Sequence, residues 1–276
     1  MTREDEATPA QDSAESQFSQ YARPLIDEAV GQAAALASST DAEVLHQMRV
    51  ALRRLRSLLW AYRPLLDRGF DDQQRALFKR LAAAAGETRD WDILIELLKH
   101  APESAALDIA ALEAERAKAL QRSRELLAGR DVKPMLRAAL QTANRALNTA
   151  HERTPLERFA RRRFASADRS LKRRMRRAAH AKRGDYASFH DVRKAAKKVR
   201  YLLEFFEPLL AKKQRKALKP LKKVQKRLGE LNDVVASEAL LQHNLGVFPD
   251  AQSGGTVLAI LGKARKRKMR AAAKLM

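Results

Sequence analysis

The sequence predicts an all-α protein, and three observations lead to this prediction. Ala, Leu, Arg and Lys are frequent whereas aromatic residues make up 5% of the 276 residues, a mixture that favours helix over strand. No segment alternates apolar and polar residues with β-branched enrichment, as an amphipathic strand would. The long amphipathic segments are separated by helix-breaking residues, at Gly69, Gly86, Pro102, Gly129, Pro155, Gly184 and Gly229 and in the segment FPDAQSGG.

The amino-terminal residues 1–17 are predicted to be a disordered acidic tail, because they offer almost nothing to bury. They contain no apolar core segment and therefore resemble neither a signal peptide nor a membrane anchor. No apolar stretch elsewhere approaches the roughly 20 residues that a membrane span needs. The absence of Cys excludes disulfides and Cys-ligated zinc. We therefore expect a cytoplasmic protein with no membrane span.

The chain is strongly basic, with a formal net charge of +22 and a pI of about 10.6. The charge is uneven: residues 1–45 hold 2 basic and 9 acidic side chains, whereas residues 158–227 hold 26 basic and 5 acidic ones. Self-repulsion of this size is more easily tolerated when a polyanion neutralises it. The candidate partners are nucleic acid, an anionic membrane surface and a non-nucleic polyanion such as polyphosphate.

One predicted helix occurs twice in the sequence. HQMRVALRRLRSLLWAYRPLL, from His46, matches HDVRKAAKKVRYLLEFFEPLL, from His190, at 9 of 21 positions without a gap. Each copy is followed by a basic helix and then by a glycine and an aspartate, Gly86 and Asp90 in the first copy and Gly229 and Asp233 in the second. The sequence therefore predicts a tandem duplication of a helical unit, with repeats at about 18–150 and 155–275.

Each copy of the helix combines an apolar wall with a cationic one. Since each residue turns by about 100°, His46, Arg49, Arg53 and Arg56 fall within a sector of about 80°, beside a stripe of leucines. Thr40 with Glu43 is predicted to cap the first helix and Ser188 the second, and Pro64 and Pro208 close them. Asp90, Asp92 and Asp233 follow the glycines, where we expect them to cap the next helices.

The cationic stripes have two interpretations. Like charges three and four residues apart cost about 0.2–0.5 kcal/mol per pair, and no acid lies between His46 and Arg63 to offset them. A solvated basic face would explain a single stripe, whereas repetition at matched positions favours binding of a multivalent anion through guanidinium–phosphate hydrogen bonds. His46 and His190 fit a phosphate donor and a structural role equally well. No second His follows at metal-ligand spacing, so we expect no metal site.

The paired H-x-x-R-x-x-x-[RK]-[RK]-x-R motifs, each followed by G-x-x-x-D, resemble those of the CHAD domain, the conserved histidine α-helical domain. The resemblance covers residues 18–275. It implies two four-helix bundles related by pseudo-twofold symmetry around a basic channel that binds inorganic polyphosphate. The residues it implicates are His46, Arg49, Arg53, Arg54, Arg56, Lys79, Arg80, His190, Arg193, Lys197, Lys198, Arg200, Lys222, Lys223 and Lys226.

We therefore predict a non-enzymatic polyphosphate-binding protein without a cofactor, with polyphosphate granules as a candidate site of association. Nucleic-acid binding is the alternative, although the stripes lack interleaved aromatic residues to stack bases and amides to read them. Trp60 and Tyr62 follow the first stripe, but Glu204 and Phe206 replace them in the second copy, and we expect Tyr62 and Phe206 in the core. A metal-dependent phosphoanhydride hydrolase would need clustered carboxylates, which the stripes do not contain.

Overall fold

The computed structural model describes residues 13–39, 41–66, 68–101, 109–127, 131–149, 153–182 and 184–276. These residues contain no strand, and a lone antiparallel bridge joins Ser13 to Pro155, so the all-α prediction is confirmed. The α-helices are α1 (Ala14–Ala35), α2 (Ala42–Tyr62), α3 (Arg68–Lys99), α4 (Ala110–Leu127), α5 (Val132–Asn148), α6 (Leu156–Ala179), α7 (Tyr186–Phe206), α8 (Lys212–Arg215), α9 (Leu218–His243) and α10 (Ala251–Ala273). The short 3₁₀ helices are η2 (Arg63–Leu65), η4 (Glu207–Leu209) and η5 (Leu245–Val247).

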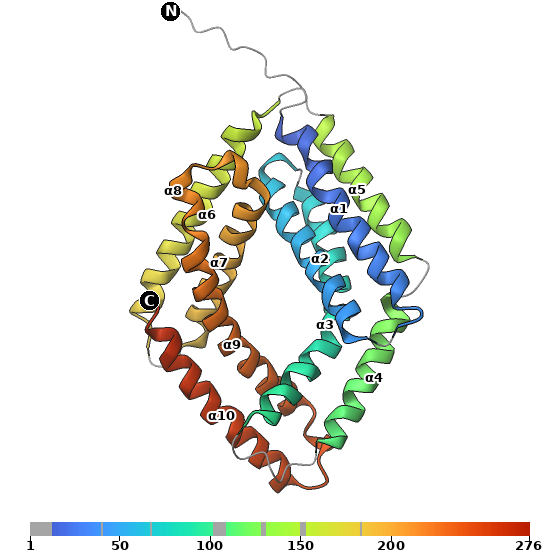
Figure 1. Ribbon diagram of the computed structural model, residues 1–276, viewed down its shortest axis with the longest axis vertical. Coiled ribbons are helices and arrows are strands. Elements are labelled where there is room, and N and C mark those ends of the chain that lie inside the picture. The colour runs from blue at the N-terminus through green and yellow to red at the C-terminus, as the bar shows by residue number, and fades with distance from the viewer. Residues whose placement is uncertain are drawn as a thin grey trace, which may run out of the picture.

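The helices of the two halves of the chain pack in the same order. In the first half α1 packs on α2, α2 on α3 and α3 on α4; in the second half α6 packs on α7, α7 on α9 and α9 on α10. The halves meet where α2 contacts α7 and where α3 contacts α9. Figure 1 shows α2 along one side of the centre of the molecule and α7 along the other, while α3 and α9 cross each other below the centre. The duplication and its pseudo-twofold symmetry stay predictions.

Two hydrophobic cores hold the helices together, and each draws on both halves of the chain. The larger core contains an aromatic cluster in which Tyr62 meets Phe18 with ring centroids 5.0 Å apart and Phe159 meets Phe206 at 6.0 Å. Tyr62 and Phe206 are fully buried, as predicted. The smaller core lies among α3, α4, α9 and α10 and includes Trp91, Leu98, Leu112, Leu241 and Leu261. Because neither core belongs to one repeat alone, the halves form one folding unit.

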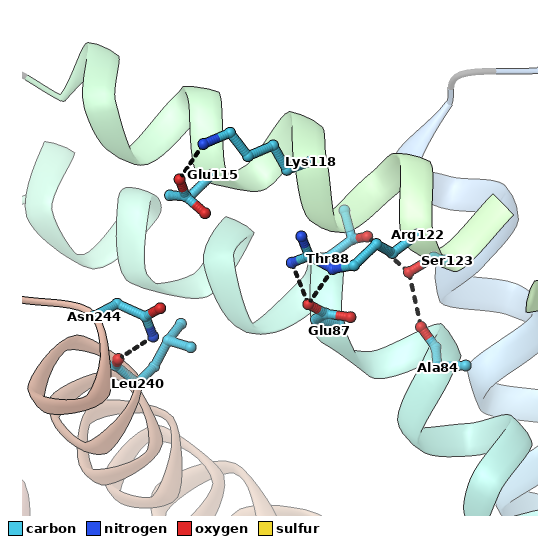
Figure 2. A network of polar contacts seen from close by, with 9 residues as sticks. All are labelled: Ala84, Glu87, Thr88, Glu115, Lys118, Arg122, Ser123, Leu240 and Asn244. Atoms are coloured by element: carbon cyan, nitrogen blue, oxygen red, sulfur yellow. Dashed lines mark hydrogen bonds and ion pairs between the residues drawn. The ribbon is translucent and has the colours of Figure 1, made fainter. Parts of the chain in front are cut away.

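Polar contacts supplement the packing of α4 against α3. Figure 2 shows the Arg122 guanidinium of α4 donating to the Glu87 carboxylate of α3, and the Ser123 hydroxyl donating to the Ala84 carbonyl oxygen at 2.8 Å. Ser123 and Thr88 are both buried, and their hydroxyl oxygens lie 3.2 Å apart. Pairing a buried hydroxyl offsets the cost of taking it out of water, so these contacts fix how α4 sits on α3.

The helix starts differ from the predicted caps. Asp41 caps α2, its carboxylate accepting from the Glu43 N–H at 2.8 Å, whereas Thr40 lies outside the described residues. Asp185 caps α7 by accepting from the Ser188 N–H at 3.2 Å, so the prediction of Ser188 as the cap is wrong. Aspartate offers two acceptor oxygens to the unpaired N–H groups of the first turn, and its charge is favourable there.

The two motif glycines do not break their helices. Gly86 lies inside α3 and Gly229 inside α9, so their predicted role as breaks is wrong. A methyl group on Gly86 would lie 3.3 Å from the Arg49 guanidinium, which shows that this glycine makes room for a side chain of α2. Nothing lies within 4 Å of the corresponding point on Gly229, and no contact in the structure explains that glycine. Gly184, with a φ of +95°, does mark the turn before α7.

The first helix begins earlier than composition predicted. Residues 14–17, assigned above to the acidic tail, are helical in α1, and Ser13 caps them. Glu15 is buried there and accepts hydrogen bonds from the Thr154 N–H at 3.0 and 3.3 Å, which ties the start of α1 to the segment before α6. Residues 1–12 lie outside the described residues. In the part of the chain that the structure describes, no helix is long and apolar enough to cross a membrane.

Candidate functional site: a cationic cavity

A cavity of about 470 Å³ lies where α2, α3, α7 and α9 face one another, and we refer to it as the central cavity. Eight cationic side chains line it and, among the described residues, a single carboxylate does. The cations are Arg49, Arg53, Arg89, Arg193, Lys197, Arg200, Lys222 and Lys226, the carboxylate is Asp233, and His46, Val50, Ile93, Tyr201 and Gln225 complete the lining. Eight of the predicted residues, including His46, are therefore brought together from three helices.

The amphipathic sequence of α2 explains how its cations reach the cavity. Its buried face, formed by residues such as Met48 and Leu52, packs into the larger core, and this leaves the adjoining face toward the cavity. The cationic face, which we call the α2 stripe, consists of His46, Arg49, Arg53 and Arg56. The Arg49 Nη1 lies 3.5 Å from the Asp90 carboxylate and 3.4 Å from the Gly86 carbonyl oxygen. The motif glycine and aspartate therefore position Arg49 instead of capping a helix.

The equivalent face of α7, which we call the α7 stripe, consists of His190, Arg193, Lys197 and Arg200. Burial lowers the pKa of Lys197 to about 7, and the positive charges of Arg193, Arg53 and Arg49 act in the same direction. Burial also lowers the pKa of Arg193. Cations from both stripes therefore converge on one desolvated point, where each raises the cost of charging the others.

Carboxylates oppose this positive charge only in part. Asp233 of α9 lines the central cavity, and Asp90 of α3 lies close enough for the two carboxylates to interact. Burial raises the pKa of both, while Arg49 favours the charged form of Asp90 and Arg193 that of Asp233. The prediction that Asp90, Asp92 and Asp233 cap helices is wrong, because all three lie inside α3 or α9.

Two guanidinium groups of the central cavity keep an unused donor. The Nε–H groups of Arg53 and Arg193 are buried, and neither has a hydrogen-bond partner among the described residues. A buried donor without a partner costs on the order of 1–3 kcal/mol, and an acceptor that reached these Nε–H groups would remove the cost. Oxygen atoms of an anion are the acceptors that suit two arginines best.

A second cavity, of about 700 Å³, adjoins the first and is called the side cavity here. It lies among α2, α6 and α7 and shares Arg53, Arg193, Lys197 and Tyr201 with the central cavity. Trp60 lies in its wall with the Arg163 guanidinium 4.5 Å and the Lys198 ammonium 4.6 Å from the ring centroid. Because two cations lie over the face of this ring, Trp60 is better placed to stabilise positive charge than to stack on a nucleic-acid base.

The two motif histidines have different surroundings. His46 lines the central cavity, and burial lowers its pKa. His190 lies outside that lining, and its Nδ1 is 3.1 Å from the Tyr186 hydroxyl oxygen, while the same hydroxyl donates to the Asn232 Oδ1 at 3.0 Å. Since the tyrosine proton is used on Asn232, His190 donates its Nδ1–H to Tyr186. Tyr186 thus joins α7 to α9 with His190 as its partner within α7, and His46 alone of the two histidines faces the cavity.

The remaining predicted residues are dispersed. Arg56 and Lys198 line the side cavity, and Lys223 lines a separate groove between α9 and α10. Lys79 and Arg80 are exposed on α3, and Arg54 is half-buried; these three line none of the cavities described here. The basic stretch of residues 158–183 was expected to line or flank a polyanion site, and its Arg163 and Arg174 line the side cavity, whereas sequence reasoning missed Arg89, Tyr201 and Gln225. The repeats gave no signal for Arg89 or Tyr201, because Asn232 and Ser57 hold the matching positions.

The arrangement suits the binding of an anion with several negative groups. Each guanidinium and ammonium group supplies donors to oxygen atoms, and the partial burial strengthens every such contact. Within the described residues, no three His, Cys, Asp or Glu side chains gather in the way that a metal ion would require.

The chain is similar to proteins of known structure and to one family. It matches the crystal structure of the CHAD domain from the plant Ricinus communis with a TM-score of 0.80 and 25% identity, over 100% of this chain and 96% of that chain. It matches PptA from Streptomyces chartreusis with a TM-score of 0.61 and 16% identity, over 95% of this chain and 97% of that chain. No curated protein matches significantly. The family model of the CHAD domain matches residues 20–242, and the chain therefore belongs to the CHAD domain family.

Proposed function

We propose that the protein binds inorganic polyphosphate in the central cavity and does not transform it. The observation that carries the proposal is the lining of that cavity, in which eight cations from four helices face a single carboxylate. The CHAD family is associated with polyphosphate, and a chain of phosphates supplies one negative charge or more per unit. Burial and then mutual repulsion lower the pKa of Lys197, and such a ligand would offset the repulsion.

The size and chemistry of the cavity favour polyphosphate over nucleic acid. A volume of about 470 Å³ is typical of small-ligand sites. Single strands bind chiefly by stacking bases on aromatic rings. Tyr201 is the sole aromatic residue among the described lining residues of this cavity, and it is buried. A narrow chain of phosphates without bases fits this lining better.

We also propose that the protein acts where polyphosphate accumulates in the cytoplasm, including on polyphosphate granules. The proposed activity is binding alone. Release of phosphate from polyphosphate in the presence of Mg²⁺ or Mn²⁺, measured with purified protein, would contradict that part of the proposal.

The test is a calorimetric titration with long-chain polyphosphate over a series of salt concentrations. Each neutralised phosphate contributes roughly 0.7 to the slope of log K against log salt for a flexible chain, so eight cations predict a slope on the order of −5. A variant in which Arg49, Arg53, Arg193 and Lys197 are changed to Ala should lose at least about a hundredfold in affinity, since each charged hydrogen bond contributes about 1.5–3 kcal/mol. Its helical circular dichroism should persist.

The competing function is tested in the same experiment with mixed RNA and DNA at equal phosphate concentration. Polyphosphate should displace nucleic acid from the protein. If nucleic acid displaces polyphosphate instead, or if the four-residue variant binds polyphosphate as the wild type does, the central cavity is not a polyphosphate site.

A further inference from the structure

A second cationic groove lies on the outside of the molecule between α9 and α10, and we refer to it as the outer groove. Its volume is about 460 Å³, and its lining residues are Lys223, Arg227, Arg267, Arg270, Ala271, Lys274 and Leu275. Five of the seven are cationic and, among the residues that the structure describes, none is acidic. α10 lies beyond the residues that the family model matches, and of the five groove cations the family resemblance implicated Lys223 alone.

The outer groove and the central cavity share one wall, which is α9. Lys222 and Lys226 line the central cavity, whereas Lys223 and Arg227, the next residue in each case, line the outer groove. Adjacent residues of a helix point about 100° apart, so the same turn of α9 presents cations to both sites. An anion that leaves the central cavity past Lys222 therefore has further cations within one turn around the helix.

The acids of α9 do not neutralise the groove. Glu238 pairs with Arg265 at 3.2 Å and Glu230 with Lys268 at 2.8 Å, and these contacts attach α10 to α9. Arg227 reaches Glu230 only at 3.8 Å, and it shares that carboxylate with Lys268. α10 itself contains no acidic residue. The groove cations at positions 267, 270 and 274 follow the spacing of three and four residues at which like charges destabilise an isolated helix.

The lining of the groove selects among polyanions. Base stacking requires aromatic rings and base reading requires amides, and the groove lining contains neither among its described residues. Insertion into a lipid surface requires a broad apolar face, whereas the apolar part of this groove is Ala271 and Leu275. Exposed cations beside a small apolar surface suit the binding of a chain of phosphates.

We propose that the outer groove is a second binding site for inorganic polyphosphate, which a long chain occupies together with the central cavity. This inference rests on the proposed function of the central cavity. A chain that reaches both sites binds the second one at high effective concentration, so long chains gain affinity that short ones do not. The outer groove would thus make the protein selective for long polyphosphate.

The test compares a groove variant, Arg267→Ala with Arg270→Ala and Lys274→Ala, with a control, Arg173→Ala with Arg176→Ala and Arg177→Ala. Both variants remove three exposed cations from a helix, and the control residues line none of the cavities described here. Affinity is measured by calorimetry for tripolyphosphate and for long-chain polyphosphate. We expect the groove variant to lower the ratio of long-chain to tripolyphosphate affinity at least about tenfold, and the control to leave the ratio as in wild type.

The outcomes separate this inference from the proposed function. If wild type binds long-chain polyphosphate tightly but the groove variant keeps the wild-type ratio, the outer groove is not a second site and the central cavity stands. If both variants lower the ratio equally, general charge explains the effect and the inference fails. If wild type binds neither ligand, the proposed function fails first. Circular dichroism and the melting temperature of each variant verify that it is folded.

Discussion

The α2 stripe and the α7 stripe share one motif but differ in how their charges are compensated. In α7 the Arg200 guanidinium pairs with Glu204 at 3.0 Å, four residues on in the same helix. In α2 the position matching Glu204 is Trp60, and Arg163 and Lys198 lie over its ring, so further cations gather there. At this position the α7 stripe is therefore partly neutralised by its own helix, whereas at the matching position of α2 cations of α6 and α7 gather instead.

The stripes also differ where Arg53 of α2 matches Lys197 of α7. Lysine can release its proton when it is desolvated, whereas arginine stays charged. The pKa of Lys197, about 7, means that the unliganded cavity can shed one of its converging charges near neutral pH. A lysine at this position of the second copy can therefore relieve the repulsion among the converging cations and still become charged when a ligand binds.

The largest effect is expected from Arg53→Ala, with Arg54→Ala as its matched control. The two arginines are adjacent in α2, but only Arg53 lines the cavities. Loss of a charged hydrogen bond worth about 1.5–3 kcal/mol predicts a 10- to 100-fold weaker affinity for polyphosphate in Arg53→Ala. The control should change affinity less than about threefold in calorimetry. Equal losses in the two variants would mean that net charge, and not the cavity, determines binding.

The next largest effect is expected on the pH dependence of stability at Lys197. Its pKa in the folded protein lies below the ordinary value of 10.5, so charging it costs stability at pH below about 7, and the cost fades as pH rises toward 10.5. Lys197→Met should therefore raise the melting temperature at pH 6, and the gain should shrink at pH 9. Lys197→Arg, which cannot lose its proton, should lower the melting temperature at pH 9, where Lys197 is neutral, and change it less at pH 6, where Lys197 is charged too. A gain from Lys197→Met that is the same at both pH values would contradict the assignment.

Polyphosphate binding should also take up a proton when the pH is above about 7, because the ligand favours the charged form of Lys197. Calorimetry at pH 8 in buffers of different ionisation enthalpy measures this uptake. The Lys197→Met variant serves as the control, since it should take up correspondingly less.

The smallest effects are expected from the histidines. His190→Ala and Tyr186→Phe should each lower the free energy of unfolding by about 1 kcal/mol and leave polyphosphate affinity nearly unchanged, because each removes a hydrogen bond of the His190–Tyr186–Asn232 chain that holds α7 on α9. His46→Ala should do the reverse and weaken binding by a few fold. Denaturant unfolding and calorimetry on the same samples distinguish the two roles. If His190→Ala weakens polyphosphate binding while the free energy of unfolding stays as in wild type, the structural role assigned to His190 is wrong.

Local sequence patterns were enough to predict the helical fold and most of the cavity lining. The apolar positions of α2 and α7 fix which side of each helix is buried, and this leaves Arg49, Arg53, Arg193 and Lys197 on the face that meets the cavity. These positions depend on spacing along one helix, which a sequence displays directly.

The errors arose where contacts between distant elements override local signals. Gly86 reads as a helix break, yet it continues α3 because the Arg49 guanidinium needs the space that a side chain would fill. Asp90 follows this glycine and therefore reads as a helix cap. Its partner is Arg49, which lies 41 residues earlier in the chain. Arg89 and Tyr201 were missed because each is specific to one repeat, so comparing the repeats concealed them.

The most direct test of the central claim is an experimental structure of the protein with long-chain polyphosphate. We expect phosphate density in the central cavity between the two stripes, with phosphate oxygens within hydrogen-bond distance of Arg53, Arg193 and Lys197. Phosphate density confined to the exposed face of α6, with no phosphate between α2 and α7, would contradict the account.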